Sequence, residues 1–292
     1  MKVIRLLERI LLPLAWLCSF ILIGAVFSVL GYLFLHGYQS FDGTLIFGST
    51  DPLDALLFKR RVFDGLFPAI GGTLLLVVLS VSGAIPIGMA TGIYLAEYGR
   101  GKTKSVLDLF FDILAGLPSI VIGLSGFALT IFLNKQFNGH IYPCLLVSSI
   151  ALAFLVLPYI IRTTQTALEG IPCNLRLTAL ALGAGKLQNI VYVLLPQALP
   201  GIISGVILAI GRCAEDTAVI MLTGVVATAG LPRSLLSNYE ALPFYIYYIS
   251  SQYMNRTELE SGYGAAIILL CICLVLFGLA FAIRKRFSLY SL

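Results

Sequence analysis

Three charged residues lie close together in one of the most apolar stretches of the sequence. The stretch is GRCAEDTAVIMLTG, and it contains Arg212, Glu215 and Asp216. In a helix, residues three and four positions after Arg212 lie on its own face. We therefore predict an internal ion pair, which leaves one carboxylate either protonated or paired with an arginine of another subunit. The alternative is that Arg212 binds an oxyanion directly, although two neighbouring carboxylates would repel an anion unless they are engaged.

The other residues with reactive side chains form no catalytic or metal-binding pattern. None of the 6 cysteines and 2 histidines has the spacing of a metal site. We expect the cysteines to be small buried apolar residues, and His36 and His140 to lie at the membrane interface. The sequence also lacks a Gly-x-x-x-x-Gly-Lys-Ser/Thr nucleotide loop. It predicts no enzyme, no metal site and no cofactor bound by this chain.

The composition indicates an integral membrane protein. Of the 292 residues, 59% are hydrophobic and only 11% are charged, whereas a soluble domain has about 25% charged residues. The net charge of +5 does not indicate nucleic-acid binding, because the basic residues lie between apolar segments rather than in one surface stripe.

Six apolar stretches reach the ~20 residues that a membrane-spanning helix needs. They are residues 11–35, 68–96, 107–133, 141–161, 197–224 and 263–283. The first is too long for a signal peptide, whose apolar region has about 7–15 residues. We therefore divide the chain into a membrane anchor with an external loop, 1–67, and a transmembrane domain, 68–292. Arg212 falls near the middle of the fifth stretch, where a charge costs ~2.5–3.5 kcal/mol and must face protein or water.

The distribution of Lys and Arg predicts that both chain termini are cytoplasmic. In that orientation twelve basic residues lie inside, around 2–9, 100–104, 162–186 and 284–286, and six lie outside, at 59–61, 135, 233 and 256. Cytoplasmic loops carry the excess of positive charge. In the fifth stretch, Gly201, Gly205, Ala209 and Cys213 recur every four residues, which predicts close packing against a neighbouring helix.

The segment between the fourth and fifth stretches is more than a connector. A short helix begins near Pro172 or Asn174 and runs to Leu182, where Gly183 and Gly185 interrupt it. We expect a second helix over 187–195, with Pro196 opening the next span. This compact shape suits docking into another protein, although an interfacial helix lying on lipid is an open alternative.

This segment resembles the EAA loop of ABC-importer permeases, where Glu-Ala-Ala precedes a glycine and a closing Ile-x-Leu-Pro. Gly183 takes the glycine position, Ala179 the second alanine, and Val193, Leu195 and Pro196 the closing positions. Leu177 and Thr178 replace the expected glutamate and first alanine. The resemblance implies that these seven residues couple the chain to an ATP-hydrolysing subunit.

Other stretches resemble the permeases of phosphate importers. They are ATGIYLAEYG at 90–99, LAGLPSIVIGLSGF at 114–127, ALPFYIYYIS at 241–250, and the opening stretch, which is similar to Ala-Arg-x-x-Gly-Glu-Thr-Ala. Asp216 takes the glutamate position of that signature, and Glu215 the glycine position. The resemblance implies that Arg212, Glu215, Asp216 and Thr217 line or gate a translocation pathway.

The resemblance implies an all-α membrane protein with six transmembrane helices, the type I ABC importer permease fold and a cytoplasmic coupling helix. The implied partners are a second permease subunit in a heterodimer, an ATPase subunit that holds ATP and Mg, a periplasmic or extracellular phosphate-binding protein, phosphate and membrane lipid. The implied location is a bacterial or archaeal cytoplasmic (inner) membrane.

Two functional alternatives remain open at this point, and so does the role of the external aromatic residues. The chain could be a permease for molybdate, sulfate or a phosphonate, or a secondary transporter. The external loop before the last span is rich in aromatic residues, which predict either an aromatic belt at the membrane surface or a gate or docking floor for the binding protein. They are Tyr239, Phe244, Tyr245, Tyr247, Tyr248 and Tyr253.

Overall fold

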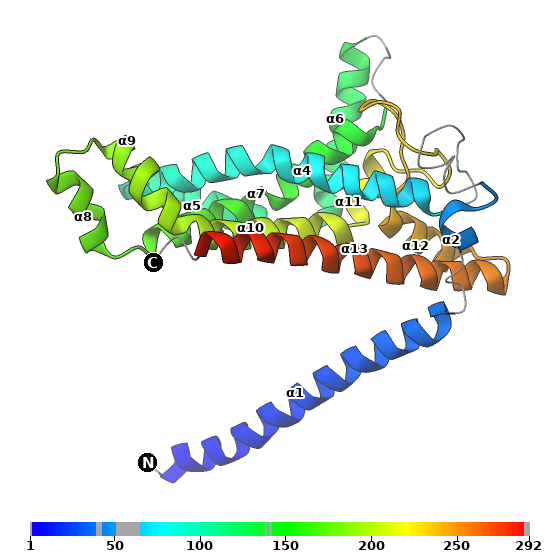
Figure 1. Ribbon diagram of the computed structural model, residues 1–292, viewed down its shortest axis with the longest axis horizontal. Coiled ribbons are helices and arrows are strands. Elements are labelled where there is room, and N and C mark those ends of the chain that lie inside the picture. Colours follow the sequence, from blue (N-terminus) through cyan, green and yellow to red (C-terminus); the bar gives the residue numbers. More distant parts are fainter. Residues whose placement is uncertain (1, 39–42, 51–64, 138, 140–141, 289–292) are drawn as a thin grey trace.

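A computed structural model describes residues 2–38, 43–50, 65–137, 139 and 142–288. The helices are α1 (Lys2–Gly37), α2 (Gly43–Phe47), α4 (Phe67–Ile93), α5 (Gly101–Ala115), α6 (Ser119–Gln136), α7 (Leu145–Glu169), α8 (Cys173–Ala181), α9 (Lys186–Asn189), α10 (Leu195–Glu215), α11 (Ala218–Thr223), α12 (Leu242–Gln252) and α13 (Arg256–Ser288). Two π-helical turns, η2 (Tyr94–Tyr98) and η3 (Ile190–Leu194), adjoin α4 and α10. The described part of the chain is thus nearly all helical (Figure 1), with one isolated β-bridge between Val225 and Tyr239.

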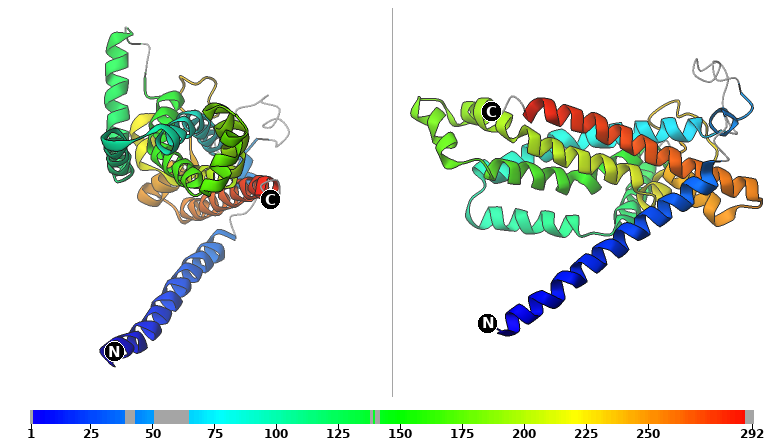
Figure 2. Two further views of the ribbon diagram at one scale, coloured as in Figure 1. Left: turned by 90° about the vertical axis from the view of Figure 1, so that its left-hand side faces the viewer. Right: turned by 60° about the horizontal axis from the view of Figure 1, so that its bottom comes forward.

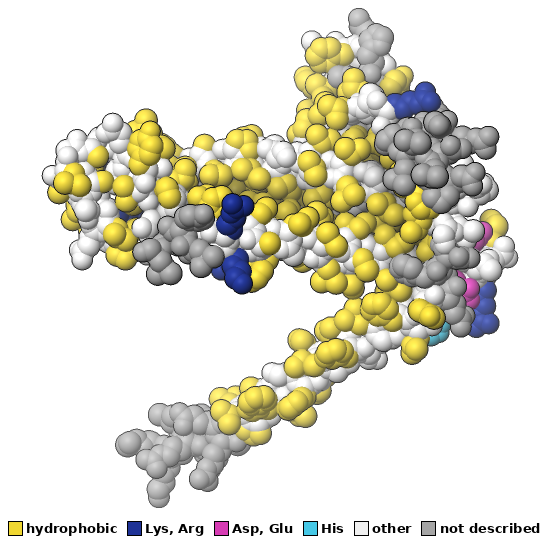
Figure 3. Space-filling view, viewed as in Figure 1, with side chains coloured by type: hydrophobic (Ala, Val, Ile, Leu, Met, Phe, Trp, Pro, Cys, Tyr) yellow, Lys and Arg dark blue, Asp and Glu magenta, His cyan; other side chains and the backbone are white. Residues whose placement is uncertain are grey.

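Six helical segments are long and apolar enough to cross a membrane, which confirms the predicted number of spans. They are Leu11–Gly37, Phe67–Tyr98, Ser119–Gln136, Leu145–Glu169, Lys186–Glu215 and Arg256–Phe287. Apolar side chains cover the long helices in the space-filling view, and few charged side chains interrupt them along the visible face (Figure 3). A hydrocarbon environment favours such a surface.

The third predicted span, 107–133, is wrong as a single helix. The chain forms α5 up to Ala115 and α6 from Ser119, and Figure 1 shows α6 running at a steep angle to the other long helices. Pro118 has an extended backbone (φ −59°, ψ 137°) and has no N–H with which to continue the helix before it. The residue before a proline also avoids the helical region, so the helix ends near Gly116.

The bundle packs around α7, α4 and α10. Its main core cluster combines residues from these three helices, among them Leu76, Leu152, Ile160 and Ala209, each almost completely buried. Small residues allow the close approach. A Cβ on Gly88 would lie 2.8 Å from Ile160, and one on Gly201 would lie 2.6 Å from Ala167.

The ridge of small residues on α10 packs as predicted. Gly201 and Gly205 face Ala167 and Thr163 of α7, and Ala209 and Cys213 are buried in the core. The wider cysteine prediction is only partly right. Cys144 is buried like Cys213, but Cys18, Cys173 and Cys271 are exposed on the surface of the chain.

Helix α1 stands away from the bundle in both views of Figure 2. None of its most apolar window is buried within the chain. The C-terminal end of α1 contacts α13. There the ring of Tyr32 in α1 lies 5.9 Å from the ring of Tyr263 in α13 and 4.1 Å from the ring of His36 in α1. The loop that follows, with Lys59, Arg60 and Arg61, lies outside the described residues, as does His140.

Candidate translocation groove and coupling loop

The charged stretch lies where a membrane helix ends. α10 stops at Glu215, Asp216 adopts an extended backbone (φ −76°, ψ 114°), and the short helix α11 follows. A carboxylate oxygen of Asp216 accepts a hydrogen bond from the backbone N–H of Val219 at 2.9 Å, which satisfies a free N–H in the first turn of α11. The predicted continuous span 197–224 is therefore wrong, and Arg212 lies in the last turn of α10 rather than mid-helix.

The predicted internal ion pairing is present. Nη1 of Arg212 lies 3.0 Å from Oε1 of Glu215, and Nη2 lies 3.9 Å from Oδ2 of Asp216. The two carboxylates differ in environment, because the Asp216 side chain is 3% exposed and that of Glu215 is 64% exposed. Neither carboxylate lacks a partner, since Asp216 also accepts the Val219 N–H. The chain itself therefore supplies a partner for the carboxylate that we expected to be protonated or paired with another subunit.

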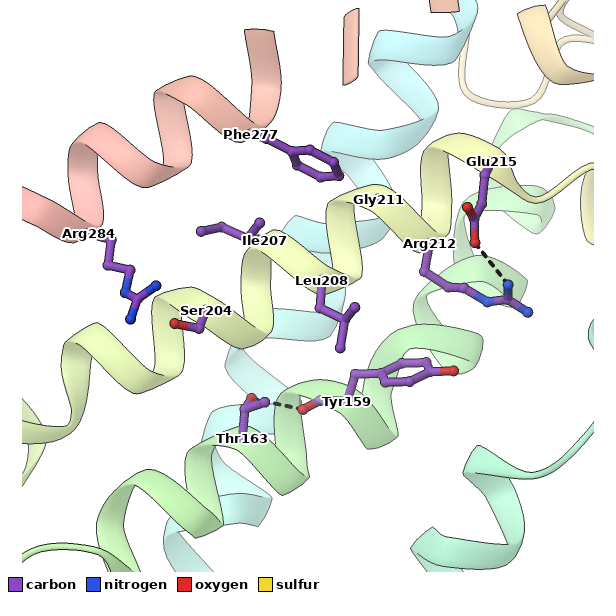
Figure 4. A pocket seen from close by; sticks show the side chains of 10 residues that line it. All are labelled: Tyr159, Thr163, Ser204, Ile207, Leu208, Gly211, Arg212, Glu215, Phe277 and Arg284. Carbon is purple, nitrogen blue, oxygen red and sulfur yellow. Dashed lines mark hydrogen bonds and ion pairs between the residues drawn. The ribbon is translucent and has the colours of Figure 1, made fainter. Parts of the chain in front are cut away.

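Arg212 and Glu215 line a groove of about 630 Å³ on the surface of the chain. Helices α7, α10 and α13 form its walls (Figure 4), and the lining residues are Tyr159, Thr163, Ser204, Ile207, Leu208, Gly211, Arg212, Glu215, Phe277 and Arg284. Thr217, predicted on the same pathway, precedes α11 and is not among them.

The lining of this groove is mostly apolar, and a few polar groups interrupt it. Arg212 and Arg284 lie toward its two ends (Figure 4), and the hydroxyl groups of Thr163 and Ser204 donate to carbonyl oxygens of their own helices. Polar and charged groups at membrane depth face protein or water rather than lipid. The groove thus has the character of a surface that a second subunit covers or that water enters.

The short helix α11 packs into a notch made by small residues of α6. A Cβ on Gly123 would lie 3.0 Å from the carbonyl oxygen of Ala218, and one on Gly126 would lie 2.8 Å from Thr223. The Thr223 hydroxyl donates to the Ser148 hydroxyl of α7 at 2.9 Å. The stretches 114–127 and 211–224, which are far apart in the sequence, are therefore in direct contact.

The coupling loop projects from the end of the bundle where α8 and α9 lie (Figure 1). Helix α8 has no buried residue, and the side chains of Leu177 and Leu182 are 56% and 85% exposed. Gly183 has a φ of +86°, which a glycine adopts without strain. Leu177, Thr178, Ala179 and Gly183 thus form one projecting tip.

The closing residues of the predicted motif lie away from that tip. Val193 is in the π-turn η3, and Leu195 and Pro196 begin α10. The prediction of a separate second helix over 187–195 is wrong, because α9 continues through η3 into α10 without a break. Pro196 lacks an N–H and crowds the carbonyl four residues earlier, and the adjoining π turn gives that part of the backbone a wider spacing.

An ion-pair network between α5 and α7 was not predicted. Arg162 lies 2.7 Å from Asp108 and 2.5 Å from Asp112, and it also donates to Gln165 at 2.9 Å. We had counted Arg162 only as a cytoplasmic positive charge. Its partners are 54 and 50 positions away in the sequence, so no local spacing rule could have indicated the network.

The external aromatic residues differ in burial. Tyr239 is fully buried in the main core, Phe244 and Tyr245 are partly buried, and Tyr247, Tyr248 and Tyr253 are exposed. Tyr239 therefore belongs to neither a membrane-surface belt nor a gate. The three exposed tyrosines are compatible with both predictions.

Beside Tyr239, the buried side chain of Glu240 organises the external loop. One of its carboxylate oxygens accepts hydrogen bonds from the backbone N–H groups of Ala229 and Gly230, each at 2.7 Å. Burial raises the pKa of Glu240 above its ordinary value, although these two hydrogen bonds oppose the shift. Among the described residues, no three His, Cys, Asp or Glu side chains gather as a metal site would require.

Comparison with known proteins gives this arrangement a family. Residues 88–289 match the model of the "binding-protein-dependent transport system inner membrane component" family. The chain is 31% identical over 279 residues to the phosphate transport system permease protein PstA of Mycobacterium leprae, covering 93% of this chain and 83% of that protein. It is 34% identical over 224 residues to PstA of Haemophilus influenzae, covering 76% and 77%.

Solved structures show the same fold. A bacterial ABC transporter involved in the import of alginate matches with a TM-score of 0.67 at 15% identity, covering 98% of this chain and 99% of that chain. The MetNI methionine ABC transporter matches with a TM-score of 0.58 at 20% identity, covering 82% and 99%. The chain has the type I ABC importer permease fold, and it belongs to the family of binding-protein-dependent transport system inner membrane components, which are multi-pass permeases and not enzymes.

Proposed function

We propose that this chain is a permease subunit of an ATP-driven phosphate importer and that it forms half of the translocation pathway. The observation that carries the proposal is the 31–34% identity to phosphate permeases over most of the chain. Since both neighbouring carboxylates contact Arg212, these residues act as a gate or structural network on the pathway rather than as an open anion site.

Other subunits supply the remaining functions of the transporter complex. ATP and Mg bind to a partner ATPase, which receives the tip of α8, and this chain binds no cofactor of its own. A second, unequal permease subunit covers the groove of α7, α10 and α13. A phosphate-binding protein docks on the opposite side of the membrane, and the exposed tyrosines of α12 form part of the surface that it contacts.

The proposed orientation puts both termini and α8 in the cytoplasm of a bacterial or archaeal cell. In Figure 1, the start of α1 and the end of α13 lie toward the same end of the molecule as α8 and α9, as an even number of spans requires. We keep the division into an anchor segment, 1–67, and a permease domain, 68–292, as part of the proposal.

The direct test is co-purification with the neighbouring subunits, followed by ATPase assays in lipid. Binding protein loaded with phosphate should stimulate ATP hydrolysis, whereas molybdate, sulfate and a phosphonate should not. Stimulation by one of those rival oxyanions instead of phosphate would identify a different cargo. Uptake that continues without ATP but stops when the proton gradient is collapsed would contradict the proposal altogether.

A further inference from the structure

Both cations of the coupling loop point back into the bundle. Arg176 and Lys186 are the only charged residues between 170 and 196. Arg176 forms an ion pair with Glu97 of η2, and it donates hydrogen bonds to the carbonyl oxygens of Leu168 and, at 3.3 Å, Ile171. The tip of α8 itself therefore carries no charged residue, and the ionic contacts of the loop are all internal.

The Arg176–Glu97 pair is well shielded from solvent. The side chains of Arg176 and Glu97 are 23% and 10% exposed. Of the two carbonyl groups that Arg176 contacts, that of Leu168 lies in the last turn of α7 and that of Ile171 lies just beyond it. The C-terminal end of a helix carries a partial negative charge that a cation stabilises. One guanidinium thus joins α8 to the ends of both α4 and α7.

Lys186 reinforces the same junction from the other side of the loop. Its Nζ donates to the carbonyl oxygen of Glu97 at 2.5 Å and lies 4.1 Å from the centre of the Tyr98 ring. The buried side chain of Asn189 donates to the carbonyl oxygen of Arg176 at 2.9 Å. Glu97 is therefore held twice, through its carboxylate by Arg176 and through its backbone by Lys186.

The backbone around this junction is π-helical on both sides. The η2 turn ends with a hydrogen bond from the Gly99 N–H to the Tyr94 carbonyl oxygen at 2.7 Å, and η3 has the same spacing between Leu195 and Ile190. Between them lies an apolar cluster in which Ile190 and Leu194 pack with Ile93 and Ala96. Single π turns within α-helices occur often at functional sites.

We propose that Glu97 is the positioning residue through which movement of α8 reaches α4, and with it the core of the permease. This inference rests on the proposed function. Helix α8 has no buried residue of its own, so its position depends on the polar contacts that its Arg176 makes with Glu97, Leu168 and Asn189. A shielded ion pair resists separation in every direction, because each partner would be left uncompensated in a poorly solvated site.

The test compares Glu97→Gln with Glu169→Gln in the complete transporter complex. Glu169, the last residue of α7, is the control, because its carboxylate pairs with Lys104 at 2.7 Å and accepts a hydrogen bond from Gln165, and neither partner belongs to the coupling loop. Glu97→Gln should lower binding-protein-stimulated ATPase activity and uptake by about tenfold or more. Basal ATPase activity and co-purification should stay unchanged, and the control should couple normally.

A second readout does not depend on the transported substrate. Hydrogen–deuterium exchange should be compared with and without a non-hydrolysable ATP analogue. In the unmodified complex, residues 94–98 should respond to the analogue together with α8. In Glu97→Gln their response should be weaker, because only the contact of Lys186 with the Glu97 carbonyl oxygen remains. An equal response of residues 94–98 in both proteins would overturn the inference. Absence of stimulation by phosphate in the unmodified complex would instead overturn only the proposed cargo.

A conservative variant covers the case in which Glu97→Gln fails to assemble. Arg176→Lys keeps the charge, but a single ammonium group cannot reach Glu97 and the carbonyl oxygens of Leu168 and Ile171 together. Reduced coupling in an assembled Arg176→Lys complex would support the junction. Normal coupling in that complex would overturn it.

Discussion

Arg212 forms ion pairs with two carboxylates that have different functions. Asp216 is buried and fixes the first turn of α11, whereas Glu215 is exposed at the groove. Arg212 therefore connects a fixed structural group with a free surface group. This arrangement suits a residue that must change partners during transport while the backbone around it stays in place.

We predict that Arg212→Ala reduces phosphate uptake by at least about tenfold, as expected for loss of a coupling interaction of a few kcal/mol. The complex should still assemble, because the change leaves the buried residues of α10, among them Ile202, Gly205 and Ala209, in place. Uptake assays and co-purification should be measured on the same membranes, with Glu215→Gln as the milder comparison. Normal uptake would refute a role on the pathway, and loss of assembly would assign Arg212 to folding.

Glu240 gives a prediction on pH dependence. Its folded-state pKa is raised above the ordinary value of 4.5, so its contribution to stability is complete below that pH and is lost as the pH rises through the folded-state value. At neutral pH, Glu240→Gln should unfold at an equal or higher temperature, because it keeps an acceptor for Ala229 and Gly230. Glu240→Ala should lose about 1–3 kcal/mol, because two backbone N–H groups lose their acceptor.

Thermal unfolding of the purified protein between about pH 5 and 8 checks these expectations, because carboxyl linkage appears as a slope of stability against pH. The advantage of Glu240→Gln should shrink as the pH falls. A difference that does not vary with pH would show that Glu240 does not titrate in this range.

Local spacing predicted some of these contacts and could not predict others. The pairs of Arg212 follow from positions three and four residues apart on one helix. The pair of Arg176 with Glu97 joins residues 79 positions apart, and it depends on how the loop folds back onto α4. Long-range pairs of this kind require the packed structure.

At the level of elements, the α7–α10 contact depends on the absence of side chains. Gly205 faces the Thr163 side chain so closely that a Cβ would overlap it. We predict that Gly205→Val separates the two helices and prevents stable assembly, because overpacking costs about 1–3 kcal/mol or more at a tight contact. Yield and thermal stability after purification are the measurements. Gly31→Val is the control, since nothing lies within 4 Å of a Cβ there, and an equal loss in both variants would contradict the packing explanation.

The ends of helices were harder to predict than their existence. Hydropathy located six spans because it measures composition, but it does not register where a helix stops. Proline alone does not mark the ends, since Pro86 and Pro158 lie inside α4 and α7. α6 begins after Pro118 and α10 ends at Glu215. The short helix α11 that follows α10 packs against α6, a long-range contact that hydropathy does not contain.

At the level of the whole molecule, the proposed orientation can be tested with a native thiol. Cys173 is exposed at the start of α8, whereas Cys144 and Cys213 are buried. We predict that a membrane-impermeant maleimide labels Cys173 in inverted vesicles and not in right-side-out vesicles, with Cys173→Ser as the control. Bound ATPase subunit should reduce the labelling. Labelling from the outside would reverse the proposed topology.

The end of α10 at Glu215 also has an electrical consequence. A helix end carries peptide groups without partners inside the helix, and hydrocarbon cannot supply them, so protein or water must reach this point. Where water enters from outside as far as Arg212, this point has the electrical potential of the outside solution. The whole membrane voltage then drops over the shorter distance between Arg212 and the cytoplasm. Moving an anion against a negative interior costs about 2.3 kcal/mol for each charge and each 100 mV. Most of that work would then be done along the groove of Tyr159, Thr163 and Ser204 rather than across the full bilayer.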